Sequence, residues 1–164
     1  MMELAWTKQL SVGNAVIDSE HKYLIGIVNS ARRAIMARDS FMLSHEFERL
    51  ENWLCVHFAN EEKIARVVNF DFSEHKLGQQ YSLKELHRLR DKWAANDGAW
   101  CESEVEHYSN SLVDWMIDGH IIQLDMLMKP ALQTYAYTFW PKWGDGAANH
   151  AAVHTANLYL QFQT

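Results

Sequence analysis

The feature that most constrains this sequence is the scarcity of helix-breaking residues among long amphipathic stretches. The 164 residues contain only two prolines and seven glycines, the residue types that most strongly interrupt helices. Before Pro130, apolar residues recur at steps of three and four, which places them on one face of a helix. The chain is therefore predicted to fold as an all-α protein.

The first predicted helix follows a short N-terminal arm. Asp18 or Ser19 provides a side chain able to cap a helix start. Apolar residues then continue at helical spacing as far as about Arg38. A turn is expected around Asp39 and Ser40.

Three more helices are predicted after this turn. The second and third cover about residues 41–67 and 73–95, and a break at 96–98 separates them from a fourth over about 102–128. Pro130 is expected to stop the fourth helix because proline lacks the backbone N–H. Four helices joined by short turns predict an up-down-up-down four-helix bundle.

The two ends of the chain differ from the bundle segments. Residues 1–16 show little helical pattern and are expected to be an ordered arm packed on the bundle. After Pro130 an aromatic stretch leads to a glycine-containing break and a short predicted helix at 147–160. We therefore divide the chain into a bundle at 1–130 and an accessory extension at 131–164 packed on it.

Composition excludes several classes of function. The formal net charge is −6 and the basic residues are scattered, so the concentrated basic surface that nucleic-acid binding requires is absent. No apolar run approaches the roughly 20 residues of a membrane span, and no secretory signal pattern appears. The two cysteines, Cys55 and Cys101, match no metal or redox motif. We expect a cytoplasmic protein without a disulfide framework or a membrane anchor.

Histidines and carboxylates at helical spacing indicate a buried metal site. His57 and Glu61 stand four residues apart, so on a helix they share one face. This spacing is common by chance, and its weight comes from candidates on every other predicted helix. Imidazole with carboxylate suits iron, whereas structural zinc often takes cysteine. The candidates on the first to fourth helices are His21; His57 and Glu61; His75; and His120 with Asp125.

The spacing between His120 and Asp125 does not fit a regular helix. Five residues turn the helix through about 140°, so the two side chains would not lie on one line. A local widening of the helix would bring them together, and such π-type bulges occur at functional sites.

These residues make the sequence resemble the hemerythrins, in particular the single-domain bacterial type. The resemblance runs from Trp6 to about Lys129. Its segments are IDSEHK at 17–22, HFANEEK at 57–63, FDFSEHK at 70–76 and WMIDGHIIQLD at 115–125.

The resemblance implies two iron ions joined by an oxo or hydroxo group and two bridging carboxylates. In this family dioxygen binds, without haem, to the iron that has two histidines. The resemblance assigns His21 and His57 to that iron, His75 and His120 to the other, and Glu61 and Asp125 to the bridges.

Gln79 departs from the family pattern, which has a histidine four residues after the one at His75. An amide oxygen is a neutral and weaker donor than imidazole. Gln79 could ligate the iron, orient a bound water, or leave room for another side chain. His150 and His154 in the tail form a pair at helical spacing and are a possible replacement.

Two functions follow from these expectations. The first is a diiron protein that binds dioxygen, or another small diatomic ligand, for storage, delivery or sensing. The second is a diiron redox enzyme that acts on dioxygen, peroxide or nitric oxide through the site altered at Gln79. A bundle that has lost its metal is a third reading, against which six of seven ligand positions match. We expect a monomer or homodimer, with residues 131–164 as a possible surface for a protein partner.

Overall fold

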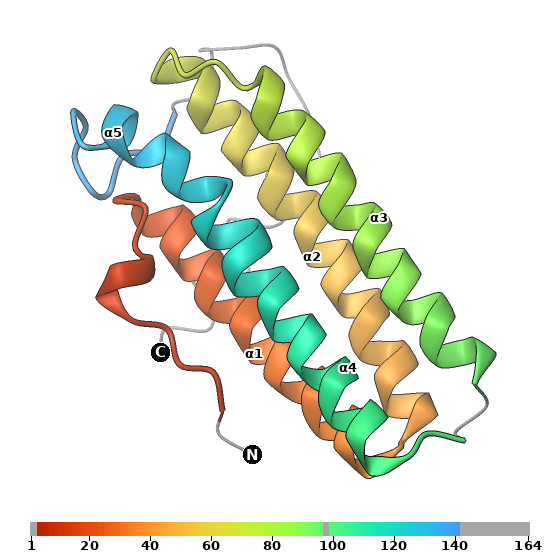
Figure 1. The fold of residues 1–164 in the computed structure, drawn as a ribbon. Helices are drawn as coiled ribbons and strands as arrows, with labels where there is room; N and C mark the ends of the chain where they lie inside the picture. Colours follow the sequence, from red (N-terminus) through yellow and green to blue (C-terminus); the bar gives the residue numbers. More distant parts are fainter. Residues whose placement is uncertain (1–2, 97–98, 142–164) are drawn as a thin grey trace.

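The structure is a computed structural model that describes residues 3–96 and 99–141. The four main helical segments of the described residues run side by side in alternating directions (Figure 1). This confirms the predicted all-α, up-down-up-down bundle. The predicted helix at 147–160, with His150 and His154, lies outside the described residues. The main helices are α1 (Ala15–Ala37), α2 (Ser40–Val67), α3 (Ser73–Ala95) and α4 (Glu102–Asp114).

The hydrophobic core consists of two clusters of buried side chains. The larger one fills most of the bundle and includes Leu24, Leu54 and Met116. The smaller one, which we call the cap cluster, closes the end of the bundle where α1 begins and α2 ends. The cap cluster comprises Val12, Ile17, Ile64, Ala65, Val68, Met128 and Leu132.

Helix α1 begins earlier than predicted. The Asn14 side chain caps it by accepting hydrogen bonds from the backbone N–H groups of Val16 and Ile17, at 3.0 and 3.2 Å. Asp18, which we expected as a cap, is fully buried and accepts from the Ser11 hydroxyl and the Val12 backbone N–H. The expected start at Asp18 or Ser19 was therefore wrong.

The fourth segment is not one continuous α-helix, contrary to the prediction for residues 102–128. After α4 the chain widens into a π-helix, η2 (Trp115–Ile122), and then tightens into a 3₁₀ turn, η3 (Asp125–Met128). The local widening that the spacing of His120 and Asp125 would require is thus present, in the segment that carries His120. Pro130 does not stop the helix, because it lies in the first turn of the short helix α5 (Lys129–Leu132), where no N–H is required.

The N-terminal arm, which contains the short helix η1 (Lys8–Leu10), packs on the bundle as expected. The Asn29 side chain fixes it by exchanging two hydrogen bonds with the backbone of Leu4.

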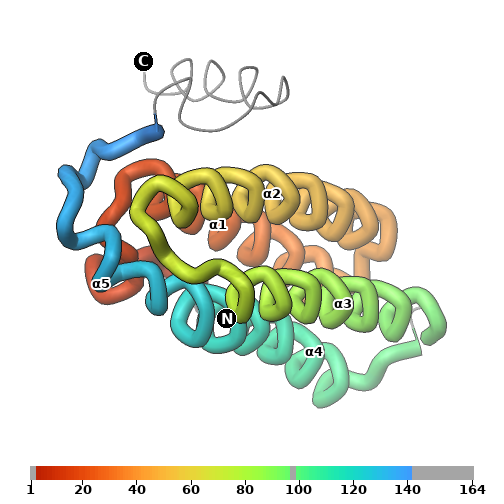
Figure 2. Tube along the Cα trace, turned by 90° about the horizontal axis from the view of Figure 1, so that it is seen from above, coloured from red at the N-terminus to blue at the C-terminus, as the bar shows by residue number. Residues whose placement is uncertain are grey.

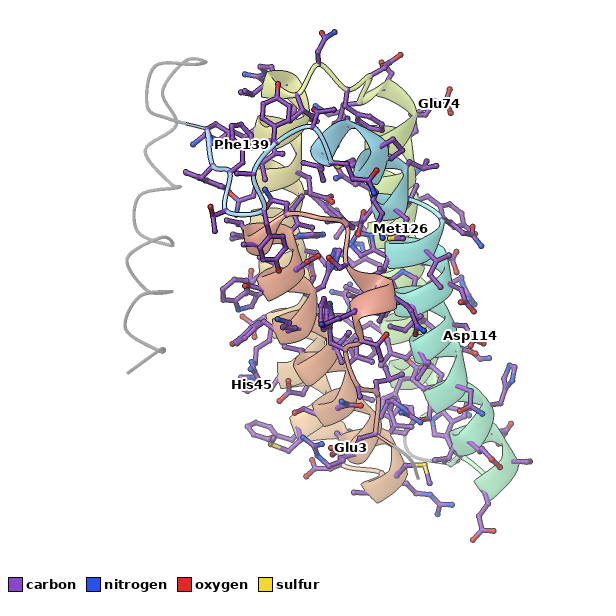
Figure 3. The ribbon with its side chains drawn as sticks, turned by 90° about the vertical axis from the view of Figure 1, so that its left-hand side faces the viewer. Glu3, His45, Glu74, Asp114, Met126 and Phe139 are labelled. Atoms are coloured by element: carbon purple, nitrogen blue, oxygen red, sulfur yellow. The ribbon has the colours of Figure 1, made fainter. Side chains whose placement is uncertain are left out.

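The segment after α5 returns across the start of α1. The backbone carbonyl of Tyr137 accepts a hydrogen bond from the Ala15 N–H, and the Tyr137 hydroxyl donates to the Asp18 carboxylate. Figure 2 shows α5 at the end of the bundle, and Figure 3 shows Phe139 and Met126 toward the same end.

Two further sequence expectations concern the cysteines and membrane-spanning helices. Cys55 and Cys101 are exposed and form no disulfide. Within residues 3–96 and 99–141, no helix is both long and apolar enough to cross a membrane.

We predict that Asn14→Ala destabilises the fold more than loss of an exposed cap. The buried Asn14 side chain caps α1 and also donates to the Phe139 carbonyl, so its removal should lower the free energy of unfolding by about 2–3 kcal/mol. Asp39→Ala removes the exposed cap of α2 and should cost about 0.5–1 kcal/mol. Urea unfolding measures both values, and equal losses would contradict the role given to Asn14.

Candidate metal centre

The predicted ligands come together in one buried layer between the two core clusters. Each helix supplies them at the level where its side chains pass from one cluster to the other, as His21 does between Ile17 and Leu24 on α1. None of the candidate side chains is more than 5% exposed. They are His21, His57, Glu61, His75, Gln79, His120 and Asp125.

Asp125 lies at the centre of this layer. Its Oδ2 atom is hydrogen-bonded to Nε2 of His21 at 2.9 Å and lies 3.3 Å from Nε2 of His120. Its Oδ1 atom lies 3.3 Å from Nε2 of His75. The His57 Nε2 atom approaches Oδ2 at 3.7 Å. Imidazoles from all four helical segments thus face one carboxylate.

Glu61 is the second buried carboxylate. Its Oε2 atom is 3.2 Å from Nε2 of His75 and accepts a hydrogen bond from the Gln79 amide at 2.9 Å. The His57 Nε2 atom lies 3.6 Å from the same oxygen. Because α2 and α3 both contribute, Glu61 joins the two helices through polar contacts.

Glu20 and Asn60 support the layer and were not among the predicted site residues. The fully buried Glu20 carboxylate accepts from Nδ1 of His57 at 2.9 Å and from the Asn60 amide at 2.5 Å. These contacts orient the His57 ring so that Nε2 faces the two carboxylates. Glu20 falls between Ile17 and Leu24 on the apolar face of α1, and a charged residue on that face was the available signal.

Aromatic rings enclose the layer. Phe58 contacts the ring of His120, with 5.4 Å between ring centroids, and Phe72 stacks on His75 at 4.5 Å. Phe58 and Phe72 therefore line the site. The Tyr108 hydroxyl instead donates to the Leu89 carbonyl, and the Trp115 indole donates to that of Ser82.

The two carboxylates have different proton affinities. Burial and the nearby charge of Asp125 raise the pKa of Glu61 above its ordinary value. Burial acts in the same direction on Asp125, but the interactions with His120 and with the imidazoles of His21, His57 and His75 outweigh it. They hold the pKa of Asp125 well below its ordinary value. Asp125 therefore stays ionised to lower pH than Glu61 does.

The imidazoles differ as well. Burial disfavours the charged form of His57, yet the Glu61 carboxylate, the nearby Asp125 and the hydrogen bond with Glu20 raise the pKa of His57 well above its ordinary value. At His120, burial and the neighbouring imidazoles outweigh Asp125 and lower the pKa to about 3. His120 is thus neutral at pH 7, the form in which imidazole binds a metal.

The donor atoms divide into two sets that share Asp125. Nitrogen and oxygen atoms of His21, His57, His120 and Asp125 lie within 4.8 Å of one another, and so do those of Glu61, His75 and Asp125. The sharing of Asp125 agrees with a bridging role. The structure groups His120 with His21 and His57, whereas the resemblance assigns it to the same iron as His75. Which metal each histidine binds stays a prediction.

Comparisons with known proteins point in one direction. No protein-family model matches the chain. The bacteriohemerythrins of Pseudomonas aeruginosa (strain LESB58) and Stenotrophomonas maltophilia (strain R551-3) are 26% and 24% identical to it over 98 residues. Each match covers 59% of this chain and 64% of the relative, which is less than two thirds of the relative's length.

A solved structure extends the likeness to the fold. The crystal structure of a hemerythrin mutant matches with a TM-score of 0.65 and 22% identity, over 80% of this chain and 98% of that one. The chain is a hemerythrin homologue. The predicted hemerythrin-like bundle is therefore confirmed, and the buried cluster lies in it. Metal binding by the individual hemerythrin ligand positions remains a prediction.

We predict that Gly78→Ala disturbs the approach of α3 to the Asp125 segment. A Cβ atom at Gly78 would overlap the Cδ atoms of Leu124, next to Asp125, whereas a Cβ at Gly26 in α1 meets no atom within 4 Å. Gly26→Ala should therefore stabilise the protein by about 0.5–1 kcal/mol, and Gly78→Ala should destabilise it by about 1–3 kcal/mol.

Urea unfolding of both variants checks this difference. Leu124→Ala combined with Gly78→Ala should recover most of the stability, since the shortened side chain leaves room for the new methyl group. A double variant no more stable than Gly78→Ala alone would contradict the proposed contact.

Proposed function

We propose that this hemerythrin homologue holds two iron ions in the buried layer and binds dioxygen, or another small diatomic ligand, for storage, delivery or sensing. The observation that carries the proposal is the concentration of unpaired buried polar atoms at the layer. Proteins leave few such atoms without partners. Within the described residues, the buried side-chain atoms without a hydrogen-bond partner are two indole nitrogens and atoms of six site residues. These residues are His21, His57, Glu61, His75, His120 and Asp125.

The donor chemistry fits iron. The layer offers imidazole nitrogens and carboxylate oxygens, and both cysteines are exposed, so no thiolate is available to favour a softer metal. His21, His57, Glu61, His75, His120 and Asp125 would hold the ions. A ferrous pair bound there would supply two electrons to dioxygen reversibly, which would allow the gas to be held without haem.

The surrounding residues would control this chemistry. Glu20 orients His57 and sets the proton on its Nδ1, so that the Nε2 lone pair faces the centre. Phe58 and Phe72 press apolar rings against His120 and His75. Together with the cap cluster, these rings limit the entry of water and protons.

Gln79 supports a second candidate, a diiron redox enzyme acting on dioxygen, peroxide or nitric oxide. It replaces the imidazole expected from the family pattern and is hydrogen-bonded to Glu61. An iron with one fewer imidazole would have an additional exchangeable position, which favours turnover over reversible binding. Spectra recorded during oxygen exposure separate the two functions.

We predict two iron ions per chain and an absorption change that reverses with oxygen. Protein reduced without air should develop a visible band on exposure to oxygen and lose it when oxygen is removed, if the protein is a carrier. Direct conversion to a stable ferric form would favour the redox enzyme.

His57→Ala should reduce iron to one ion or fewer, while His87→Ala, which removes a surface pair with Glu51, should keep two. One iron or none in the unaltered protein would sink the dinuclear site.

We also predict that Glu20→Gln weakens iron binding. Glu20 uses one carboxylate oxygen for His57 and the other for Asn60. Glutamine has only one oxygen, and its NH₂ group would face one of these two donors. His57 should therefore lose its fixed orientation. Iron should pass to a chelator about 10–100 times more readily. Glu62→Gln is the matched control, because Glu62 is partly exposed and pairs with Lys76. Equal release from both variants would contradict the role of Glu20.

A further inference from the structure

Gln79 occupies a bundle-facing position on α3, one helical turn after His75. Its side chain is 5% exposed, and buried amides require hydrogen-bond partners. The partner of its amide nitrogen is Oε2 of Glu61, at 2.9 Å. Gln79 is therefore part of the polar layer.

The chemistry of the two groups decides which amide atom faces Glu61. A carboxylate that binds a metal is ionised and only accepts hydrogen bonds, and the NH₂ group is the only donor of a glutamine side chain. The amide carbonyl oxygen is the atom that could bind a cation, and it therefore points away from Oε2 of Glu61. An amide nitrogen held in this way offers no lone pair to a metal.

The two donor sets differ in the number of their residues, and the smaller set lies on the side of Gln79. Four residues form the set with His21, His57 and His120, whereas the set on the α3 side has only Glu61, His75 and Asp125. Metal sites that take up exogenous ligands keep positions that the protein does not fill. With one residue fewer, the α3-side set leaves more coordination positions that the protein does not fill.

The space on the α3 side is narrow. Phe72 stacks on His75, and a Cβ atom at Gly78 would overlap a Cδ atom of Leu124, so that this side chain would have to shift. A ligand of two or three atoms suits such a site better than an organic substrate.

Building on the proposed diiron function, we infer that Gln79 is a positioning residue that holds Glu61 and leaves an open position on the α3-side metal. A small anion or diatomic gas binds at that position, on the metal held by Glu61, His75 and Asp125. The site for exogenous ligands thus differs from the one that the family resemblance implies, on the iron of His21 and His57.

Azide titration of the iron-loaded, ferric protein tests this inference after iron has been counted. Gln79→His places an imidazole at the open position and should weaken azide binding at least tenfold, with two irons retained. Gln79→Leu keeps the position open but removes the donor to Glu61. It should bind azide as the unaltered protein does and lose iron to a chelator about tenfold faster. Gln80→His makes the same change at the exposed neighbouring residue and should alter neither property.

Three results would overturn the inference while leaving the diiron site intact. The first is two irons with no azide binding in the unaltered protein. The second is unchanged azide affinity in Gln79→His. The third is a second azide bound by Gln79→Leu, which would show that the glutamine itself had occupied the position. Fewer than two irons in the unaltered protein would instead refute the proposed function.

Discussion

Asp125 carries its charge in the interior of the bundle with imidazoles from four helical segments around it. Removing a carboxylate from water costs several kcal/mol unless other charges and hydrogen bonds compensate. With Glu61 nearby, two acids and four imidazoles form a layer that apolar packing cannot stabilise. The division of the core into two clusters follows from this layer, since apolar side chains fill the bundle only above and below it.

The layer also explains the irregular fourth segment. A regular α-helix turns His120 and Asp125 away from each other, and the π-helix of η2 followed by the tight turn of η3 brings both to the centre. The sequence indicated this irregularity, because the spacing of two candidate ligands was incompatible with regular helix geometry. The helix ranges at 41–67 and 73–95 were equally accessible, since apolar periodicity and short turns define them.

Other features could not be predicted because they depend on contacts distant in sequence. Asp18 is a good capping residue by type, but Ser11 and Tyr137 provide it with buried partners, and Asn14 caps α1 instead. Whether Pro130 ends the helix depended on where the next helical turn begins, because proline is tolerated in a first turn. Glu20 was visible only as a charge on an apolar face, and its role required knowing that His57 lies opposite.

The distribution of donors over the helices gives the site a direction. Helices α1 and α2 and the π-helix supply three imidazoles and share Asp125, while α3 supplies one imidazole and an amide that is bound to Glu61. In the proposed diiron site, imidazole at position 79 would bind a cation directly, whereas the amide would stabilise a carboxylate that does so. Glutamine would then keep open a coordination position that histidine would fill. Because the other six candidate positions carry imidazole or carboxylate groups, Gln79 would change the access of ligands more than the capacity to hold metal.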